Sequence, residues 1–238
     1  MVCFFGENIE NVSFTGNGKV IFNGGADDFY MDYDTWRAKE NELKRPFGFL
    51  FRRCERILLQ DLELYGSGFW MQQYLECRQL KINKVKIVNH ANWNNDGLDI
   101  NNCKDVIISD CIIYCSDDAI CVKSTSNGLN ENILITNCIL RTHYNGFKIG
   151  TETMGGGVKN LVMSNCVISA PGYKNMHGSI VNGENDLGFA GIAVQCCDGA
   201  TIENINISNI VIDSMRTPIF IRLEKRMRPC TPAILAAV

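Results

Sequence analysis

Two short acidic strings could supply the carboxyl groups of an acid–base catalyst. The first is Asn94-Asn95-Asp96-Gly97 and the second is Ser116-Asp117-Asp118-Ala119. Carboxyl groups gathered in one small region repel one another when ionised, and this raises the pKa of at least one of them. The protonated carboxyl can then act as a general acid while an ionised neighbour acts as a base. Hydrolysis of a glycosidic bond uses this division of roles.

The alternative interpretation of these residues is structural. An isolated aspartate in an Asn-Asp-Gly turn more often caps backbone amides than takes part in chemistry. Here, however, Asp96, Asp118 and Asn145 each precede a similar apolar strand by the same number of residues. If those strands stack, the three residues lie along one edge with Asp117 beside them. We therefore predict Asp96, Asp117 and Asp118 as catalytic residues.

The elements that would position these residues are copies of one short unit with alternating apolar and polar residues, the period of a β-strand. One such unit cannot bury its apolar face alone, whereas stacked copies share a continuous core. Gly, Asn and Asp stand between the copies, as turns require. The copies cover residues 57–62, 80–85, 106–111, 133–138, 161–166 and 205–210, with a weaker early copy at 9–14.

A second strand in each repeat can be aligned independently of the first. It predicts two inward-facing rows in which successive members stack on one another. The first row is Leu98, Ile120, Phe147, Ile192 and Ile219, and the second is Ile100, Val122, Ile149, Val194 and Ile221. The two alignments contain the same long interval, so we predict an all-β fold, a parallel β-helix with coils about 4.8 Å apart. Two excursions are expected, at residues 27–42 and within 171–188.

Bulk properties bound the function. The chain has 238 residues, of which 46% are hydrophobic, and the repeat predicts one domain over residues 1–238. A net charge of −3 does not favour nucleic acid or a membrane surface as partner. There is no run of 18 apolar residues, so no membrane span is predicted. The first five residues run directly into strand pattern without a leader, and a monomer is expected.

Twelve cysteines allow either a disulfide framework or buried thiols. Cys111, Cys138 and Cys166 occupy one repeat position, and Cys54, Cys77 and Cys103 recur at similar intervals. Cysteine behaves as a small hydrophobic residue that suits a stacked interior row. We therefore predict mainly reduced thiols in the core, and the spacing does not favour a zinc site.

At Asn94-Asn95-Asp96-Gly97 and Asp117-Asp118-Ala119-Ile120 the chain resembles glycoside hydrolase family 28, the polygalacturonases, whose members carry Asn-x-Asp followed by Asp-Asp. The resemblance extends to residues 145–150 and to Phe220-Ile221-Arg222-Leu223, where the family has an Arg-Ile-Lys string. It covers most of residues 1–226. It implies a right-handed parallel β-helix and an inverting hydrolase of pectic poly- or oligosaccharide, secreted or periplasmic, with no cofactor or metal.

The resemblance also implies roles for individual residues. Asp117 would be the general acid, and Asp96 and Asp118 would hold and deprotonate the attacking water. Arg222 would contact a substrate carboxylate next to the cut. Inverting enzymes separate acid and base by roughly 6.5–9.5 Å, and we expect one coil rise with a lateral offset to reach that range.

Further substrate-binding residues are predicted at Asn94, Lys123, Asn145 and Lys148. Lys123 and Arg222 fall in one outward row of the strand alignment, and cations there suit a uronate carboxylate; the alternative is a solvated polar face. Asn145 stands where the family usually has His, and Glu224 where it has Lys. These departures favour a different or decorated pectic sugar, including rhamnogalacturonan, over plain polygalacturonate.

Two other functions stay open. Polysaccharide lyases also use parallel β-helices, but a lyase needs a calcium cluster with an Arg or Lys base, and an Asp-Asp pair without a nearby Arg fits hydrolysis better. A non-catalytic carbohydrate-binding solenoid is the third possibility. Elimination leaves an unsaturated sugar and hydrolysis does not, so the products separate the first two.

Overall fold

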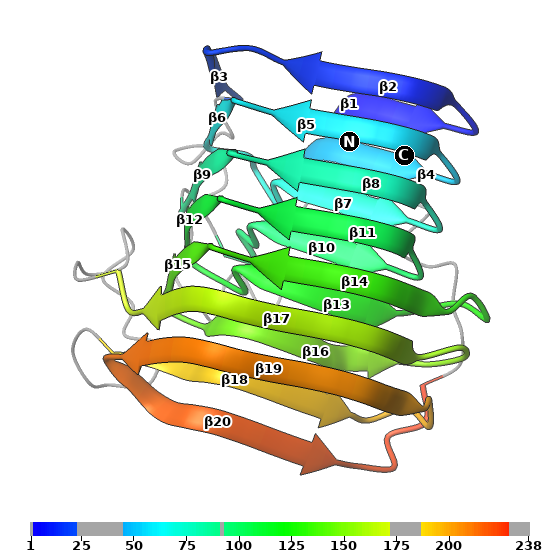
Figure 1. The fold of residues 1–238 in the computed structure, drawn as a ribbon, viewed down its shortest axis with the longest axis vertical. Helices are drawn as coiled ribbons and strands as arrows, with labels where there is room; N and C mark the ends of the chain where they lie inside the picture. The colour runs from blue at the N-terminus through cyan, green and yellow to red at the C-terminus, as the bar shows by residue number, and fades with distance from the viewer. Residues whose placement is uncertain (1, 23–44, 91–92, 172–186, 229–238) are drawn as a thin grey trace.

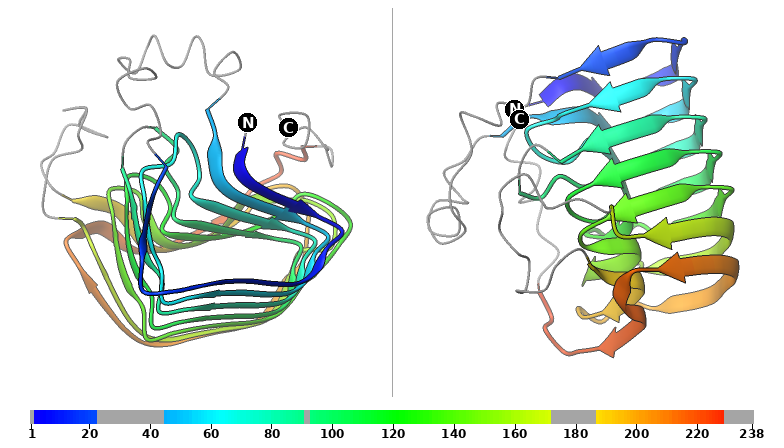
Figure 2. Two further views of the ribbon diagram at one scale, coloured as in Figure 1. Left: turned by 90° about the horizontal axis from the view of Figure 1, so that it is seen from above. Right: turned by 90° about the vertical axis from the view of Figure 1, so that its left-hand side faces the viewer.

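The computed structural model describes residues 2–22, 45–90, 93–171 and 187–228. Their regular elements are all strands, and each strand pairs in parallel with its neighbours. Successive strands wind into a stack of coils (Figure 1), and the coils superimpose when seen along the stack (Figure 2). The predicted all-β fold, a right-handed parallel β-helix, is confirmed.

One side of the stack is an eight-stranded sheet, named sheet A here, which carries the site described below. Its strands in order are β1 (Val2–Glu7), β4 (Phe47–Arg52), β7 (Gln72–Leu75), β10 (Leu98–Asn101), β13 (Ile120–Ser124), β16 (Asn145–Thr153), β18 (Gly188–Cys196) and β20 (Met215–Leu223).

A second, twelve-stranded sheet bends around the remaining two sides. Its first limb holds β2 (Glu10–Thr15), β5 (Glu55–Gln60), β8 (Arg78–Asn83), β11 (Lys104–Ser109), β14 (Asn130–Thr136) and the first parts of β17 (Val158–Ser169) and β19 (Ile202–Asp213). Its second limb holds β3 (Lys19–Ile21), β6 (Glu63–Tyr65), β9 (Lys86–Asn89), β12 (Ile112–Cys115), β15 (Ile139–Thr142) and the remaining parts of β17 and β19.

The pairing register confirms the inward rows predicted for sheet A. Leu98 lies opposite Ile120, which lies opposite Phe147, and the row continues through Ile192 to Ile219. Leu98, Ile120 and Phe147 are completely buried. The repeat alignment therefore identified both rows, but their last members, Ile219 and Ile221 on β20, are exposed rather than buried.

The early copy at residues 9–14 was misaligned. The structure pairs Val12 with Ile57, so that copy begins three residues later than predicted. The reason is a turn. Asn11 and Arg56, directly before the paired residues, both have left-handed backbone, with φ of 59° and 56°. The chain bends there, so Ile9 belongs to the preceding corner rather than to the strand.

Left-handed residues recur at the same corner in later coils and make the turns possible. Asparagine and aspartate tolerate this conformation better than most residues. Their side chains also join neighbouring coils, because Asn160 donates to Asn132 and Asn204 donates to Asn160, each at 3.1 Å. The left-handed residues at this corner are Asn11, Arg56, Gln79, Asp105, Asn132, Asn160 and Asn204.

The described cysteines are free thiols, as predicted, and nine of them are buried. Cys138 lies between Cys111 and Cys166 in one row of the core, and its amide approaches the sulfur of Cys166 at 3.5 Å. A thiol in such a row fills space that a larger side chain would overpack.

The predicted excursion at residues 27–42 and most of the one within 171–188 lie outside the described residues, so both stay predictions. The single domain over residues 1–238 is likewise a prediction. Among the residues described, none belongs to a helix that could cross a membrane.

Candidate active site

The candidate site lies at the start of strands β10 and β13, where the chain turns into sheet A. Backbone hydrogen bonds join the turns of successive coils: Gly97 N donates to Asp118 O, and Ala119 N donates to Asn145 O, each at 2.9 Å. Asp96, Asp118 and Asn145 therefore stack in three consecutive coils, as their common offset from the strands predicts.

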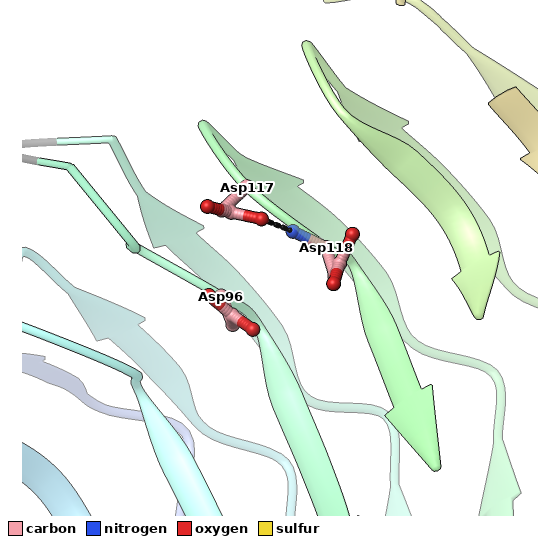
Figure 3. Close-up of side chains that lie close together, drawn as sticks. All are labelled: Asp96, Asp117 and Asp118. Carbon is pink, nitrogen blue, oxygen red and sulfur yellow. Dashed lines mark hydrogen bonds between the residues drawn. The ribbon is translucent and has the colours of Figure 1, made fainter. Parts of the chain in front are cut away.

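Three carboxylates meet at this edge. Asp96, Asp117 and Asp118 each have an oxygen within 4.8 Å of the other two, and Figure 3 shows them on two neighbouring coils. Asp96 and Asp118 are buried, whereas Asp117 is partly exposed. The amide of Asp118 donates to Oδ1 of Asp117 at 2.8 Å, which fixes the bend that turns adjacent residues toward one site.

This spacing is shorter than expected. The sequence led us to expect 6.5–9.5 Å between acid and base, but the nearest carboxylate oxygens lie within 4.8 Å. Asp117 and Asp118 both reach Asp96 on the neighbouring coil, so their nearest oxygens are not separated by the lateral offset that the expectation assumed.

Asp118 is held on both of its oxygens. Asn145 Nδ2 donates to Oδ1 at 2.6 Å, and Lys148 Nζ donates to Oδ2 at 2.7 Å. Hydrogen bonds of this kind to a carboxylate are strong and fix its orientation. Asn145 and Lys148, both predicted to contact substrate, here contact a predicted catalytic residue.

Lys123 contacts the carboxylates of the coil that contains Asp96. Its Nζ lies 2.7 Å from Oδ1 of Asp99 and 3.6 Å from Oδ2 of Asp96, and it stands 3.5 Å from the centre of the Trp70 ring. Only 5% of the Lys123 side chain is exposed. Lys123 thus makes its ion pairs inside the protein.

Burial and mutual repulsion raise the pKa values of the carboxyls. Burial, and then the charge of Asp118, raise the pKa of Asp117 to about 7. Burial, followed by the charges of Asp99 and Asp117, raises the pKa of Asp96 well above its usual range. Burial also raises the pKa of Asp99 to about 6, although Lys123 opposes this rise. The cluster therefore retains protons near neutral pH.

The pKa values of the two lysines are also raised, but by neighbouring negative charges and against the effect of burial. Burial alone would lower the pKa of Lys123, but the combined effect of its neighbours, Asp99 foremost and then Cys121, Asp96 and Glu152, holds that pKa above its usual value. The pKa of Lys148 is raised in the same way, because Asp118, Cys121 and Asp117 together outweigh the effect of burial. Both ammonium groups therefore stay charged.

Two predicted substrate-binding residues lie apart from this cluster. Asn94 accepts a hydrogen bond from Arg45 Nη2 at 3.0 Å, which ties down the turn before Asp96. Arg222 lies on β20, three strands from β13 in sheet A and thus about 14 Å away at about 4.8 Å per strand. It is half exposed and pairs with Glu224 at 2.8 Å. The structure does not bring Arg222 to the carboxylates.

Asp99 is the residue that the sequence analysis missed. It is completely buried next to Lys123 and Asp96. A signal was available, because the alternation of residues 98–101 puts Asp99 on the outward face between two inward residues. It was overlooked because it follows the turn motif and looks like an ordinary polar strand residue.

Three carboxylates could in number bind a cation, but the charge balance here opposes it. The ammonium groups of Lys123 and Lys148 already lie against Asp96 and Asp118. A metal ion at this point would be repelled by both, and it would displace the proton that burial keeps on Asp117. We therefore assign no metal to these residues.

The chain thus combines a parallel β-helix with a cluster of aspartates on one sheet, an arrangement typical of carbohydrate-active solenoid proteins. The sequence profile described as Glycosyl hydrolases family 28 matches residues 1–233. The chain belongs to that family.

Relatives and solved structures agree with this assignment. The chain is 24% identical to a probable polygalacturonase of Arabidopsis thaliana over 66% of its own length and 38% of the relative's. It is 24% identical to a probable exopolygalacturonase B of Aspergillus flavus, covering 86% of this chain and 44% of the relative. The chain thus spans less than half the length of these relatives.

The fold matches that of an exopolygalacturonase from Thermotoga maritima with a TM-score of 0.74 and 20% identity, covering 94% of this chain and 57% of that one. A polygalacturonase from Erwinia carotovora matches with a TM-score of 0.71 and 17% identity, covering 92% and 56%. At these identities the likeness concerns the fold.

Proposed function

We propose that the protein hydrolyses a glycosidic bond of a pectic polysaccharide with inversion at the anomeric carbon. Asp117 protonates the leaving oxygen, and Asp96 and Asp118 hold the attacking water. The observation that carries this proposal is the meeting of three carboxylates within 4.8 Å, with only Asp117 partly open to solvent.

The proton distribution supports these roles. A general acid must carry its proton near the working pH, and the pKa of Asp117 is raised to about 7. Asp118 is held by hydrogen bonds from Lys148 and Asn145, whereas Asp117 meets neither of these side chains in a hydrogen bond. The partly exposed Asp117 and the buried Asp118 thus differ in environment. Such a difference is the usual way that two carboxyls take different roles.

The short spacing is compatible with a shared water molecule. A water that donates two hydrogen bonds of about 2.8 Å, at the angle between its own O–H bonds, bridges oxygens roughly 4.4 Å apart. Oxygens of Asp96 and Asp118 lie within 4.8 Å of each other. This supports the assignment of the nucleophilic water to that pair, although the spacing is below the range typical of inverting enzymes.

The ion pairs of the three predicted substrate-binding cations bear on which sugar the protein would accept. Lys123, Lys148 and Arg222 each pair with a carboxylate of the protein itself, namely Asp99, Asp118 and Glu224. Each would have to leave that partner to bind a uronate. We therefore propose a rhamnogalacturonan-type or otherwise decorated linkage in preference to unbranched polygalacturonate. Contacts from Asn94, Asn145, Lys148 and Arg222 to the substrate remain part of the proposal, whereas the Lys123 ammonium is buried against Asp99 and Asp96.

The same ion pairs disfavour a lyase. A lyase base must lose its proton near the working pH, but the pKa values of Lys123 and Lys148 are raised by Asp99 and Asp118. A charged lysine cannot remove a proton from the sugar ring.

The test is incubation with defined oligosaccharides of polygalacturonate and rhamnogalacturonan, with products analysed by mass and by proton NMR of the new reducing end. We expect saturated products of inverted configuration, formed faster from rhamnogalacturonan. Unsaturated products would indicate a lyase, and a retained configuration would contradict the proposed water. Binding without cleavage would indicate the non-catalytic alternative.

A further inference from the structure

Lys123 makes three contacts for which the proposed reaction has so far no use. We propose that Lys123 is a positioning residue for catalysis: its ammonium orients Asp96 and supplies its counter-charge, while Asp99 and the Trp70 ring hold the ammonium in place. This inference rests on the proposed function and assigns three further residues to it.

The strand register explains how one ammonium reaches two carboxylates of the neighbouring coil. Lys123 on β13 lies opposite Asn101 on β10, and Asp99 lies two residues before Asn101 on the same face. The lysine side chain therefore runs diagonally toward the start of β10. There its Nζ lies 2.7 Å from Oδ1 of Asp99 and 3.6 Å from Oδ2 of Asp96.

Trp70 closes the opposite side of the ammonium. It belongs to the coil before Asp96, since Met71 N donates to Asp96 O at 3.0 Å. Its ring is 8% exposed and stacks on Phe69 with centroids 5.0 Å apart, and the Lys123 Nζ stands 3.5 Å from the ring centre. A desolvated cation over an indole is stabilised by the ring. The Trp70 ring therefore helps to fix the position of the Lys123 ammonium.

The carboxylate of Asp99 holds the Lys123 ammonium in an ion pair. Its side chain is completely buried, and within the described part of the chain the Lys123 contact is the one interaction recorded for its carboxylate oxygens. A buried carboxylate is costly unless it is paired. Asp99 therefore pairs with Lys123 and thereby competes with Asp96 for the same positive charge.

The surrounding charges make this competition matter. Asp117 and Asp118 face Asp96 from the turn before β13, Lys148 and Glu152 reach the cluster from β16, and the Cys121 thiol lies near Lys123. Asp96, Asp99, Asp117 and Asp118 share the two buried ammonium groups. Lys123 stabilises the ionised form of Asp96 to the extent that its charge is not already balanced by Asp99. This stabilisation therefore decides how readily Asp96 ionises to bind and activate water.

Two substitutions test the inference because they act in opposite directions. In Asp99→Asn the ammonium has one carboxylate fewer to neutralise, so Asp96 ionises more readily. We expect the acidic limb of the kcat/KM profile to move to lower pH by about 1 unit, the lower end of the effect of a nearby charge. In Lys123→Met that limb moves to higher pH by about 1 unit.

The kinetic constants separate positioning from substrate binding. Lys123→Met should lower kcat by about 10²-fold, the lower end of what acid–base groups contribute, and leave KM within about threefold, since Lys123 is not proposed to bind substrate for this step. Lys123→Arg keeps the positive charge and should keep the acidic limb within about 0.5 unit of that of the unaltered protein.

Asp198→Asn is the matched control. Asp198 is also a fully buried carboxylate that holds a cation, Arg226 at 2.5 Å, but on the coils beyond β16. Its loss should lower thermal stability without moving the acidic limb. If Asp99→Asn and Lys123→Met leave that limb in place, or move it in the same direction, the inference is wrong.

A second readout does not depend on turnover. Carbon-13 NMR of the aspartate carboxyls follows the titration of Asp96 in folded protein, with circular dichroism to verify folding of each variant. We expect Asp96 to titrate at lower pH in Asp99→Asn and at higher pH in Lys123→Met. Unchanged titration in both would overturn the inference even if hydrolysis is observed. Absence of hydrolysis by the unaltered protein with these NMR shifts present would refute the proposed function alone.

Discussion

Asp117 differs from its two partners in its exposure to solvent. Asp96 and Asp118 are buried and meet lysines, whereas Asp117 is partly exposed and has a backbone amide as its recorded side-chain donor. A carboxyl in this position can meet the leaving oxygen of a bound sugar and keeps a proton to give. The chemistry of the site thus depends on one side chain whose surroundings do not neutralise it.

Replacing Asp117 by Asn should lower kcat by about 10²–10⁴-fold, the usual contribution of a general acid. The amide preserves the shape of the side chain but has no acidic proton to transfer. Initial rates on the best oligosaccharide measure the effect. Asp213→Asn, an exposed residue at the end of β19, serves as the control and should leave the rate unchanged. A variant at position 117 that keeps most of its activity would remove Asp117 from the mechanism.

The pH dependence follows from the same residue. A general acid works only while protonated, and the pKa of Asp117 is raised to about 7. We therefore expect kcat/KM to fall as pH rises through about 7, since the free enzyme then loses the proton. Rates measured from pH 4 to 9 at constant ionic strength would show this limb. A limb near the ordinary aspartate pKa would contradict the proposed environment of Asp117.

At the level of elements, the site depends on how closely two turns approach. Gly97, between Asp96 and β10, has room for no side chain: a Cβ there would lie 2.5 Å from Ala119 O and 2.6 Å from Ile113 Cγ2. The missing side chain lets Gly97 N donate to Asp118 O. The sequence Asn-Asp-Gly therefore sets the distance between the two catalytic coils.

Gly97→Ala should push these coils apart, because backbone atoms cannot yield as a flexible side chain can. We expect a loss of about 1–3 kcal/mol in the free energy of unfolding, as for other overpacked positions. We also expect a rate loss approaching 10²-fold, since about 1 Å of misplacement can cost that much. Urea unfolding and initial rates measure the two effects. Gly18→Ala is the control, because a Cβ there meets nothing within 4 Å; equal effects at both positions would refute the argument.

At the scale of the whole molecule, the thiols report on the closed core. Nine of the described cysteines are buried, and burial raises the pKa of Cys115 and Cys121. Thiols react as thiolates, so these groups should be inert in the folded protein.

We therefore expect a thiol reagent to modify at most three of the twelve cysteines in the native protein and all twelve in denaturant without reductant. Absorbance of the released reagent gives both counts. Fast modification of more than three would show that the coils open readily. Fewer than twelve in denaturant would reveal disulfides and contradict the prediction of reduced thiols.

Much of the coil stack could be predicted because its signals are local. Alternation identified the inward residues of sheet A, and the common offset of Asp96, Asp118 and Asn145 predicted their stacking. The misaligned copy at residues 9–14 failed for a local reason as well. The left-handed Asn11, which marks the turn, looks like any polar residue in the sequence.

The arrangement of cations could not be predicted in the same way. Lys123, Lys148 and Arg222 looked alike in the alignment, as outward cations able to meet a uronate. The structure gives them different partners, because Lys123 reaches Asp99 diagonally, Lys148 reaches Asp118, and Arg222 pairs with Glu224 at the far strand. Asp99 was missed because its importance depends entirely on the side chain that meets it.

Sequence alone determined the register of the windings and, through it, the stacking of Asp96 against the Asp117–Asp118 doublet, because a period of two and short turns leave the backbone few choices. Only the tertiary structure decided which ammonium neutralises which carboxylate. A lysine side chain has four rotatable bonds and spans more than one strand spacing, so its partner is selected by burial and by neighbours such as Trp70 rather than by its position in the chain.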